Sequence, residues 1–107
     1  MRVTVFHLRS DASGDVRWAV SCGEVAPLVN FDAVAVLEVP SLGDAFEASQ
    51  HIDSDWSKAD GVKMLTLQSP RSTSVGDLLE TPEGVYVVAP NGFSKVDLRA
   101  LVIEAML

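Results

Sequence analysis

The stretch RSTSVGDLLE, Arg71–Glu80, places an arginine and three hydroxyl side chains before a glycine, an acid and two leucines. Ser74 and Asp77 have the S-x-x-D spacing of a capping box. In this motif the serine oxygen accepts an N–H three residues ahead, and the acid reaches back to the serine N–H. A carboxylate is also favoured at the positive end of a helix dipole. The spacing therefore predicts a helix over residues 75–80.

The same S-x-x-D spacing occurs at Ser41–Asp44 and at Ser94–Asp97, each beside an apolar periodic run. It predicts two more helices, over residues 42–50 and 95–106. The last of these carries a broad apolar stripe, which we expect to pack on a sheet. A second hypothesis is that part of this stripe forms a homodimer through the C-terminal segment.

Gly76 is unusual inside a predicted helix, because glycine costs about 1 kcal/mol there relative to alanine, and Gly43 repeats the pattern. A close neighbour would explain both glycines. That neighbour is either another backbone segment or an anionic ligand held by free N–H groups with help from Arg71. Alternatively, the guanidinium of Arg71 bridges a carboxylate such as Asp53 or Asp77, which would fix the loop over residues 51–56 to this stretch.

Three other segments predict strands. Residues 2–8 alternate in polarity and are rich in β-branched side chains, and residues 31–39 are stopped by a proline. Residues 85–89 form a near-continuous apolar run, which is typical of a buried strand. Pro90-Asn91-Gly92 then predicts a sharp turn. Residues 16–25, VRWAVSCGEV, fit neither period cleanly, and we interpret them as a short helix.

The composition suits one core: the chain has 107 residues, 48% hydrophobic and 21% charged. We expect a single α+β domain over residues 1–107, with a short mixed or antiparallel sheet packed against two or three short helices. No run approaches the roughly 18 apolar residues of a membrane span, and residues 1–10 resemble a strand rather than a secretory signal. A cytoplasmic protein without membrane contact is therefore expected. Cys22 has no second thiol, and we expect it to be buried and inert.

The net charge of −7 makes direct nucleic-acid binding an unfavourable hypothesis, because no basic patch is visible to neutralise phosphates. The acids concentrate between Ser41 and Gly61, where Lys58 is the one basic residue. Such a surface either keeps the protein in solution, meets a basic partner, or imitates the phosphates of DNA.

The candidate catalytic and metal-binding residues do not form a known constellation. His51, Asp53 and Asp55 alternate, but a calcium loop starting at Asp53 would need glycine where Lys58 stands and an acid where Met64 stands. No serine lies in the G-x-S-x-G pattern of a nucleophile elbow. We therefore predict no enzymatic activity, no metal site and no cofactor.

Trp56 stands in the polar run DSDWSK. A tryptophan in such a run either plugs the core from a turn or stays exposed as an anchor for a partner. Both interpretations remain open from the sequence.

Three stretches, SLGDAFEASQHIDSDWSKADGV, RSTSVGDLLE and VYVVAPNGFSKV, resemble YodL-like domains, small proteins encoded by phages, plasmids and other mobile elements. The resemblance begins at Ser41 and leaves the first 40 residues uncovered. It is carried by Gln50, His51, Ile52, Asp53, Trp56, Arg71, Ser72, Ser74, Val75, Gly76, Asp77, Gly92 and Phe93. It implies a strand after the Gly-Phe pair, in place of the helix predicted there. It also implies a mobile-element accessory protein, found near anti-restriction genes, without established enzymatic chemistry.

The leading functional hypothesis is a non-enzymatic accessory protein of a mobile element that binds an unknown protein partner. The interaction candidates are His51, Asp53, Asp55, Trp56, Arg71, Ser72, Ser74, Asp77 and Phe93. The first alternative is an acidic DNA mimic that inhibits a host nucleic-acid enzyme, in the manner of anti-restriction proteins. The second alternative is a small domain that binds an anionic ligand.

Overall fold

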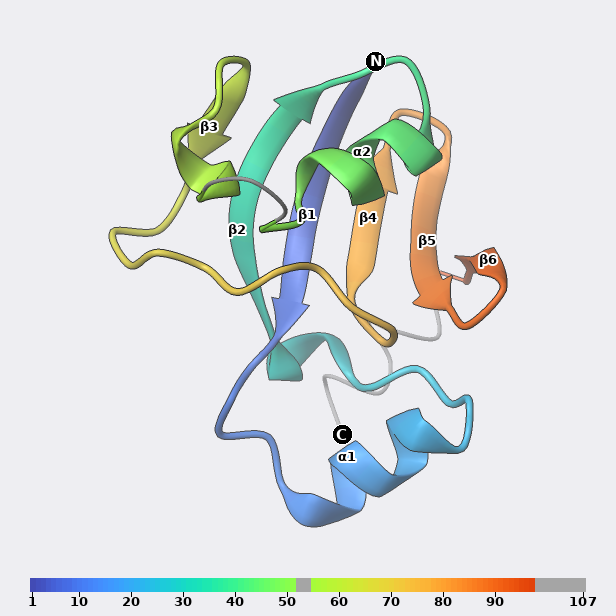
Figure 1. Cartoon of the computed structure of the whole chain (residues 1–107). Coiled ribbons are helices and arrows are strands. Elements are labelled where there is room, and N and C mark those ends of the chain that lie inside the picture. Colours follow the sequence, from blue (N-terminus) through green and yellow to red (C-terminus); the bar gives the residue numbers. More distant parts are fainter. Residues whose placement is uncertain (52–54, 98–107) are drawn as a thin grey trace.

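A six-stranded antiparallel sheet organises the protein, and the computed structural model describes residues 1–51 and 55–97 (Figure 1). Neighbouring strands follow the order β3-β2-β1-β4-β5-β6. Their bounds are β1 Arg2–Leu8, β2 Phe31–Glu38, β3 Val62–Met64, β4 Leu78–Thr81, β5 Gly84–Ala89 and β6 Gly92–Val96. The α+β class and the antiparallel sheet are confirmed, although the sheet is larger than the short one expected.

Two α-helices and two 3-10 turns accompany the sheet. They are α1 Gly14–Ser21, α2 Leu42–Ala48, η1 Leu28–Asn30 and η2 Trp56–Lys58. The capping box before α2 forms in part: the Ser41 hydroxyl accepts the Asp44 N–H as predicted, whereas the Asp44 carboxylate accepts from the Ser41 hydroxyl and not from the Ser41 N–H. The predicted helix is confirmed, although it ends at Ala48 and not at residue 50. The helix expected within residues 16–25 is also confirmed, and Ser13 caps it by accepting the Val16 N–H.

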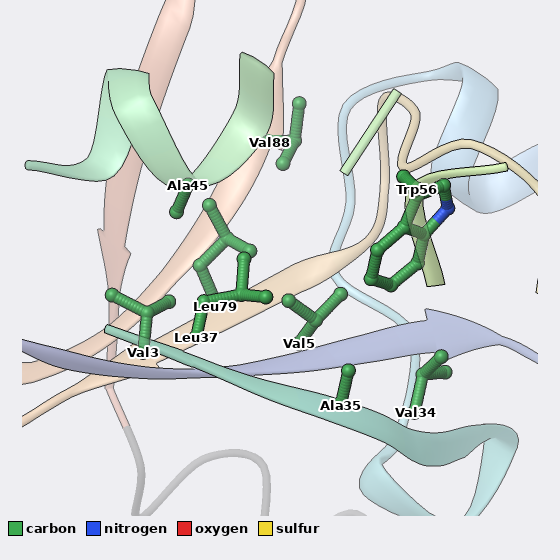
Figure 2. Packing of buried hydrophobic residues seen from close by; sticks show 9 residues of the cluster. All are labelled: Val3, Val5, Val34, Ala35, Leu37, Ala45, Trp56, Leu79 and Val88. Atoms are coloured by element: carbon green, nitrogen blue, oxygen red, sulfur yellow. The ribbon is translucent and has the colours of Figure 1, made fainter. Parts of the chain in front are cut away.

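The sheet is buried on both faces. Val3 and Val5 of β1 lie in one apolar cluster with Ala45 of α2 and Trp56 of η2 (Figure 2). Phe6 packs against a second cluster with side chains from α1 and the segment after it. In Figure 1, α2 crosses in front of β1 and β4, whereas α1 lies beyond the end where β1 stops. The alternation of β1 therefore supplies apolar side chains to two separate cores.

The helix predicted over residues 75–80 is wrong. Residues 78–81 form β4, which pairs with β1 on one side and β5 on the other. Gly76 cannot continue a right-handed helix, because its φ is +94°. Two ladders of backbone hydrogen bonds and the burial of Leu78 and Leu79 therefore override the local capping signal.

The helix predicted over residues 95–106 is also wrong at its start. Lys95 and Val96 belong to β6, where they pair with Tyr86 and Val85 of β5. The predicted turn at residues 90–92 joins these two strands and is confirmed. Residues 98–106 of that prediction lie outside the described part of the chain.

The close neighbour inferred at Gly76 is a side chain of α1. A Cβ at this position would lie 2.5 Å from Cγ1 of Val20, and the backbone is in the left-handed region. The Gly76 N–H donates to the Val88 carbonyl at 2.9 Å. Gly76 is therefore required by sterics and by φ, and its N–H is occupied by a backbone acceptor.

The environment of Cys22 differs from the expectation. It caps the C-terminus of α1, where its N–H bonds to the carbonyls of the last turn, and its side chain is exposed. The prediction of a buried cysteine was wrong because α1 buries none of its residues and the chain stays exposed from Ser21 to Glu24. Within residues 1–51 and 55–97, no helix is long and apolar enough to cross a membrane.

Candidate functional site

Except for Phe93, the described candidate residues fall on two segments that are joined side by side, residues 49–57, of which 52–54 lie outside the described part of the chain, and residues 69–77. The backbone N–H of Thr73 donates to the Ser49 carbonyl at 2.9 Å, and the side-chain amide of Gln50 donates to the Thr73 carbonyl at 2.8 Å. The His51 N–H donates to the Ser72 hydroxyl at 2.8 Å. The two motifs singled out in the sequence therefore form one structural unit.

Trp56 is the apolar centre of this unit. Its side chain is only 2% exposed and belongs to the core beneath α2 (Figure 2). The indole Nε1–H donates to the Arg71 carbonyl at 3.0 Å, and the ring lies edge-on to His7. The interpretation of Trp56 as a core plug is confirmed, so its indole does not form part of an exposed contact surface.

Arg71 and Asp77 form a bidentate ion pair, with N–O distances of 2.6 and 2.8 Å. The Asp77 side chain is 1% exposed, and its carboxylate also accepts the N–H groups of Leu8 and Ser74. Arg71 donates in addition to the Leu8 carbonyl. The predicted pairing of Arg71 with an acid of this region is confirmed for Asp77. The pair ties the 71–77 turn to the end of β1.

His51 and Asp55 connect the two segments. The His51 Nδ1 accepts the Trp56 N–H and its Nε2 donates to the Pro70 carbonyl, which identifies the neutral Nε2–H tautomer. Hydrogen bonds from the hydroxyls of Ser57 and Ser69, with the Ser57 N–H, lower the pKa of Asp55 to about 2. Both side chains are therefore engaged in contacts that join the two segments.

His7 is a buried polar residue that the sequence pattern placed only on a strand face. Its Nε2 lies 2.9 Å from the Thr73 hydroxyl, although 66 residues separate the two in sequence. Burial lowers the pKa of His7 to about 4, while Asp77 opposes this shift and Arg71 adds to it. His7 is thus neutral at physiological pH.

The depressed pKa of His7 predicts a loss of stability in mild acid. The unfolded chain takes up this proton near pH 6.5, whereas the folded chain resists it until about pH 4. The unfolded state is therefore favoured progressively as pH falls between these values, by about 2–3 kcal/mol in total. Urea unfolding followed by circular dichroism at intervals from pH 7 to 4 measures this change.

A His7→Gln variant is the control, because it keeps a polar partner for Thr73 but does not titrate. Its stability should be less dependent on pH across the same interval. The pKa values of Asp11 and Asp55 are lowered from 3.8, so these groups lose their stabilising charge below this window. An equal pH dependence in wild type and variant would contradict the assignment to His7.

The structure separates the candidate residues into different environments. Ser72 and Ser74 lie in the joined segments, with Ser72 half-buried and Ser74 exposed. Phe93 lies on β6 and contacts Phe46 of α2 edge-to-face, with ring centroids 6.3 Å apart. Asp53 lies outside the described residues. The core of the site is therefore a structural clamp, with Arg71 and Ser74 at its exposed border.

A surface that the sequence analysis did not identify lies at the β3 edge of the sheet, next to η2 of the candidate site. Leu67 is fully exposed and Leu65 is 47% exposed, directly after edge strand β3. Alternation from residue 62 to 67 was the one signal that could have revealed it. That signal is weak because the strand is only three residues long.

Searches against protein-family models, curated proteins and solved structures find no match to this chain. Within the described ranges, no three His, Cys, Asp or Glu side chains are grouped closely enough to hold a metal ion. A function must therefore be inferred from the surfaces of the chain itself.

Proposed function

We propose that this protein is a non-enzymatic interaction module that binds a partner protein along the outer edge of β3. The observation that carries the proposal is a pair of exposed leucines, Leu65 and Leu67, beside the terminal strand of the sheet. A terminal strand presents backbone N–H and C=O groups that can pair with an added strand.

The edge of β3 has the backbone geometry for strand addition. Among the described residues β3 pairs only with β2, through the register Ala35–Met64 to Leu37–Val62. The Leu65 N–H donates to the Val34 carbonyl at 2.8 Å, so the paired backbone extends one residue beyond the strand. An extended peptide on the outer side would continue the same antiparallel sheet.

The leucines supply the apolar part of this surface. Leu65 and Leu67 follow β3 in a segment of bends, residues 65–68, and both side chains are exposed. Isolated exposed leucines are common on protein surfaces, but two adjoining an open strand edge form a more specific contact. The matching partner is an extended segment with apolar side chains at alternate positions.

The surroundings of the histidines support a binding role rather than catalysis. Both ring nitrogens of His51 are engaged, by the Trp56 N–H and the Pro70 carbonyl. His7 is buried, and its Nε2 is engaged by Thr73. A general base must be able to reach a substrate proton. The histidines of this chain are arranged to hold structure.

The resemblance to YodL-like domains is what supports a mobile-element setting for such a module. The DNA-mimic alternative receives less support from the acids. Asp77 is buried, and the Asp55 carboxylate accepts hydrogen bonds from Ser57 and Ser69. These two carboxylates are therefore not available for the row of exposed carboxylates that a DNA mimic needs.

Substitution of the edge leucines tests the proposal. Leu67→Glu and Leu65→Glu each place a charge on the apolar strip and should abolish specific capture of a partner from host lysate. Deuterium exchange of the purified complex provides the second measurement. The amides of β3 that do not donate to β2 should exchange more slowly in the complex than in the free protein, since strand addition protects the outer edge.

Val75→Glu is the matched control for this experiment, because Val75 is 49% exposed, close to the 47% of Leu65, and lies on a different surface. It should capture the same partner as the wild type. Capture that survives both leucine substitutions, or a complex without protection of the β3 amides that do not donate to β2, would exclude the β3 edge as the binding surface.

A further inference from the structure

A pocket of about 510 Å³ lies where α1, the end of β1 and the 71–77 turn meet. This volume is within the range of small-molecule sites. Its polar lining includes Arg17, Arg71 and the hydroxyl residues Ser10 and Ser74, and its apolar lining includes Val20 and Val75. Two guanidinium groups therefore face one small pocket on a chain whose net charge is −7.

Arg17 donates to backbone carbonyls at this pocket. Its Nε donates to the Ala12 carbonyl at 3.2 Å, and its Nη2 donates to the carbonyls of Arg9 and Ser10. Carbonyl acceptors fix the orientation of a guanidinium without cancelling its charge. Among the described residues, no ion pair includes Arg17. Backbone carbonyls fix its guanidinium, and the Asp11 carboxylate lies near enough to interact with it electrostatically.

Arg71 is oriented toward the same pocket from the other side. Its carboxylate partner Asp77 is buried beneath it, whereas the Arg71 side chain is 44% exposed. The bidentate pair fixes the plane of the guanidinium. Arg17 and Arg71 against Asp77 leave one net positive charge among the ionisable residues that line the pocket.

An apolar groove adjoins this cationic pocket. It has a volume of about 660 Å³ and shares Val20, Ser21 and Val75 with the pocket. Val25 and Val87 line its apolar part, and the charged residues Glu24, Lys95 and Asp97 also line it. The two hollows therefore form a continuous surface with a cationic end and an apolar end.

We propose that this surface binds a small amphipathic anion, of the class of medium-chain carboxylates. The carboxylate lies between Arg17 and Arg71, and the aliphatic chain lies over Val20 and Val75 into the groove. The guanidinium groups attract a carboxylate mainly through their charge, since most of their N–H groups already donate to backbone carbonyls and to Asp77. The site is separate from the β3 edge, so it does not depend on the protein-binding role.

Titration of ¹⁵N-labelled protein with octanoate, followed by NMR, tests the proposal. The amides of Ser10, Arg17, Val20 and Val75 should shift together and saturate at millimolar octanoate. Acetate and inorganic phosphate supply the charge alone, and octanol supplies the chain alone. Each should bind about tenfold more weakly than octanoate, because each makes only part of the contacts.

Two variants locate the site. Arg17→Gln removes one charge-assisted contact, and Val75→Glu places a carboxylate at the junction of the two hollows. Each should weaken octanoate binding about tenfold or more. Leu67→Glu introduces the same charge as Val75→Glu but lies outside both hollows, and should bind octanoate like the wild type.

Three results would overturn the proposal. The first is no saturable shift with octanoate. The second is equal affinity for octanoate and for acetate or phosphate, which would show that the aliphatic chain of octanoate contributes nothing to binding. The third is unchanged affinity in folded Val75→Glu, which keeps the site testable even if Arg17→Gln fails to fold.

Discussion

Arg71→Ala is expected to lower the free energy of unfolding by about 3 kcal/mol, because it leaves the Asp77 carboxylate buried without its cation. The change also removes the hydrogen bond from Arg71 to the Leu8 carbonyl. Asp77 keeps the N–H groups of Leu8 and Ser74, so the loss should lie at the lower end of the range for broken buried pairs. Urea unfolding at pH 7 measures the difference.

Arg9 provides the matched control for this prediction. It also forms a bidentate pair with Asp11, through Nε and Nη2 in place of the Nη1 and Nη2 of Arg71, with both N–O distances at 3.0 Å, but both side chains are well exposed. Arg9→Ala should leave stability within experimental error, since solvent screens a surface pair. Similar losses in the two variants would show that burial of Asp77 does not decide the effect.

The comparison of Arg71→Ala with Arg9→Ala also shows whether Arg71 is needed for the fold, which affects how a loss of partner binding is interpreted. A residue that only binds a partner can be replaced without loss of fold, whereas Arg71 joins the 71–77 turn to the end of β1. A loss of partner binding in Arg71→Ala would therefore reflect unfolding as much as contact. For this reason the leucines at the β3 edge, which are exposed, are better probes of binding.

The capping motif shows how far local sequence determines this fold. The S-x-x-D spacing at Ser41 predicts α2 correctly, because no strand competes for that segment. The identical spacing at Ser74 forms only the acid half of the motif, in which Asp77 accepts the Ser74 N–H. The chain then enters β4. The difference comes from the pairing of residues 78–81 with two strands, β1 and β5. A local sequence motif does not predict such long-range pairing.

The candidate site was predictable to the extent that its partners are close in sequence. The pairing of Arg71 with Asp77 spans six residues and follows from opposite charges near one turn. The contacts of this turn with His7 and Leu8 span more than 60 residues and depend on β1 and β4 being neighbours. The cationic pocket depends in the same way on α1 lying against the 71–77 turn.

Trp56→Ala should destabilise the protein by about 3–5 kcal/mol, the range for loss of a fully buried tryptophan. The indole fills the core beneath α2 with Val5 and Leu79, and its removal would leave a cavity there (Figure 2). It would also leave the Arg71 carbonyl without the Nε1–H donor. Denaturant unfolding followed by circular dichroism gives the value, with Trp18→Ala measured in parallel.

Trp18 is the appropriate comparison because it is 73% exposed, whereas Trp56 is 2% exposed. Trp18→Ala should change stability by less than about 1 kcal/mol, as expected for an exposed surface site. Trp56→Phe separates the two contributions of the indole, since it keeps most of the apolar volume and removes only the donor. Its cost should be about 1–3 kcal/mol. Equal stability of Trp56→Ala and Trp18→Ala would contradict this prediction. It would mean that the folding of the two joined segments does not depend on the indole, and Trp56 would again be a candidate for partner contact.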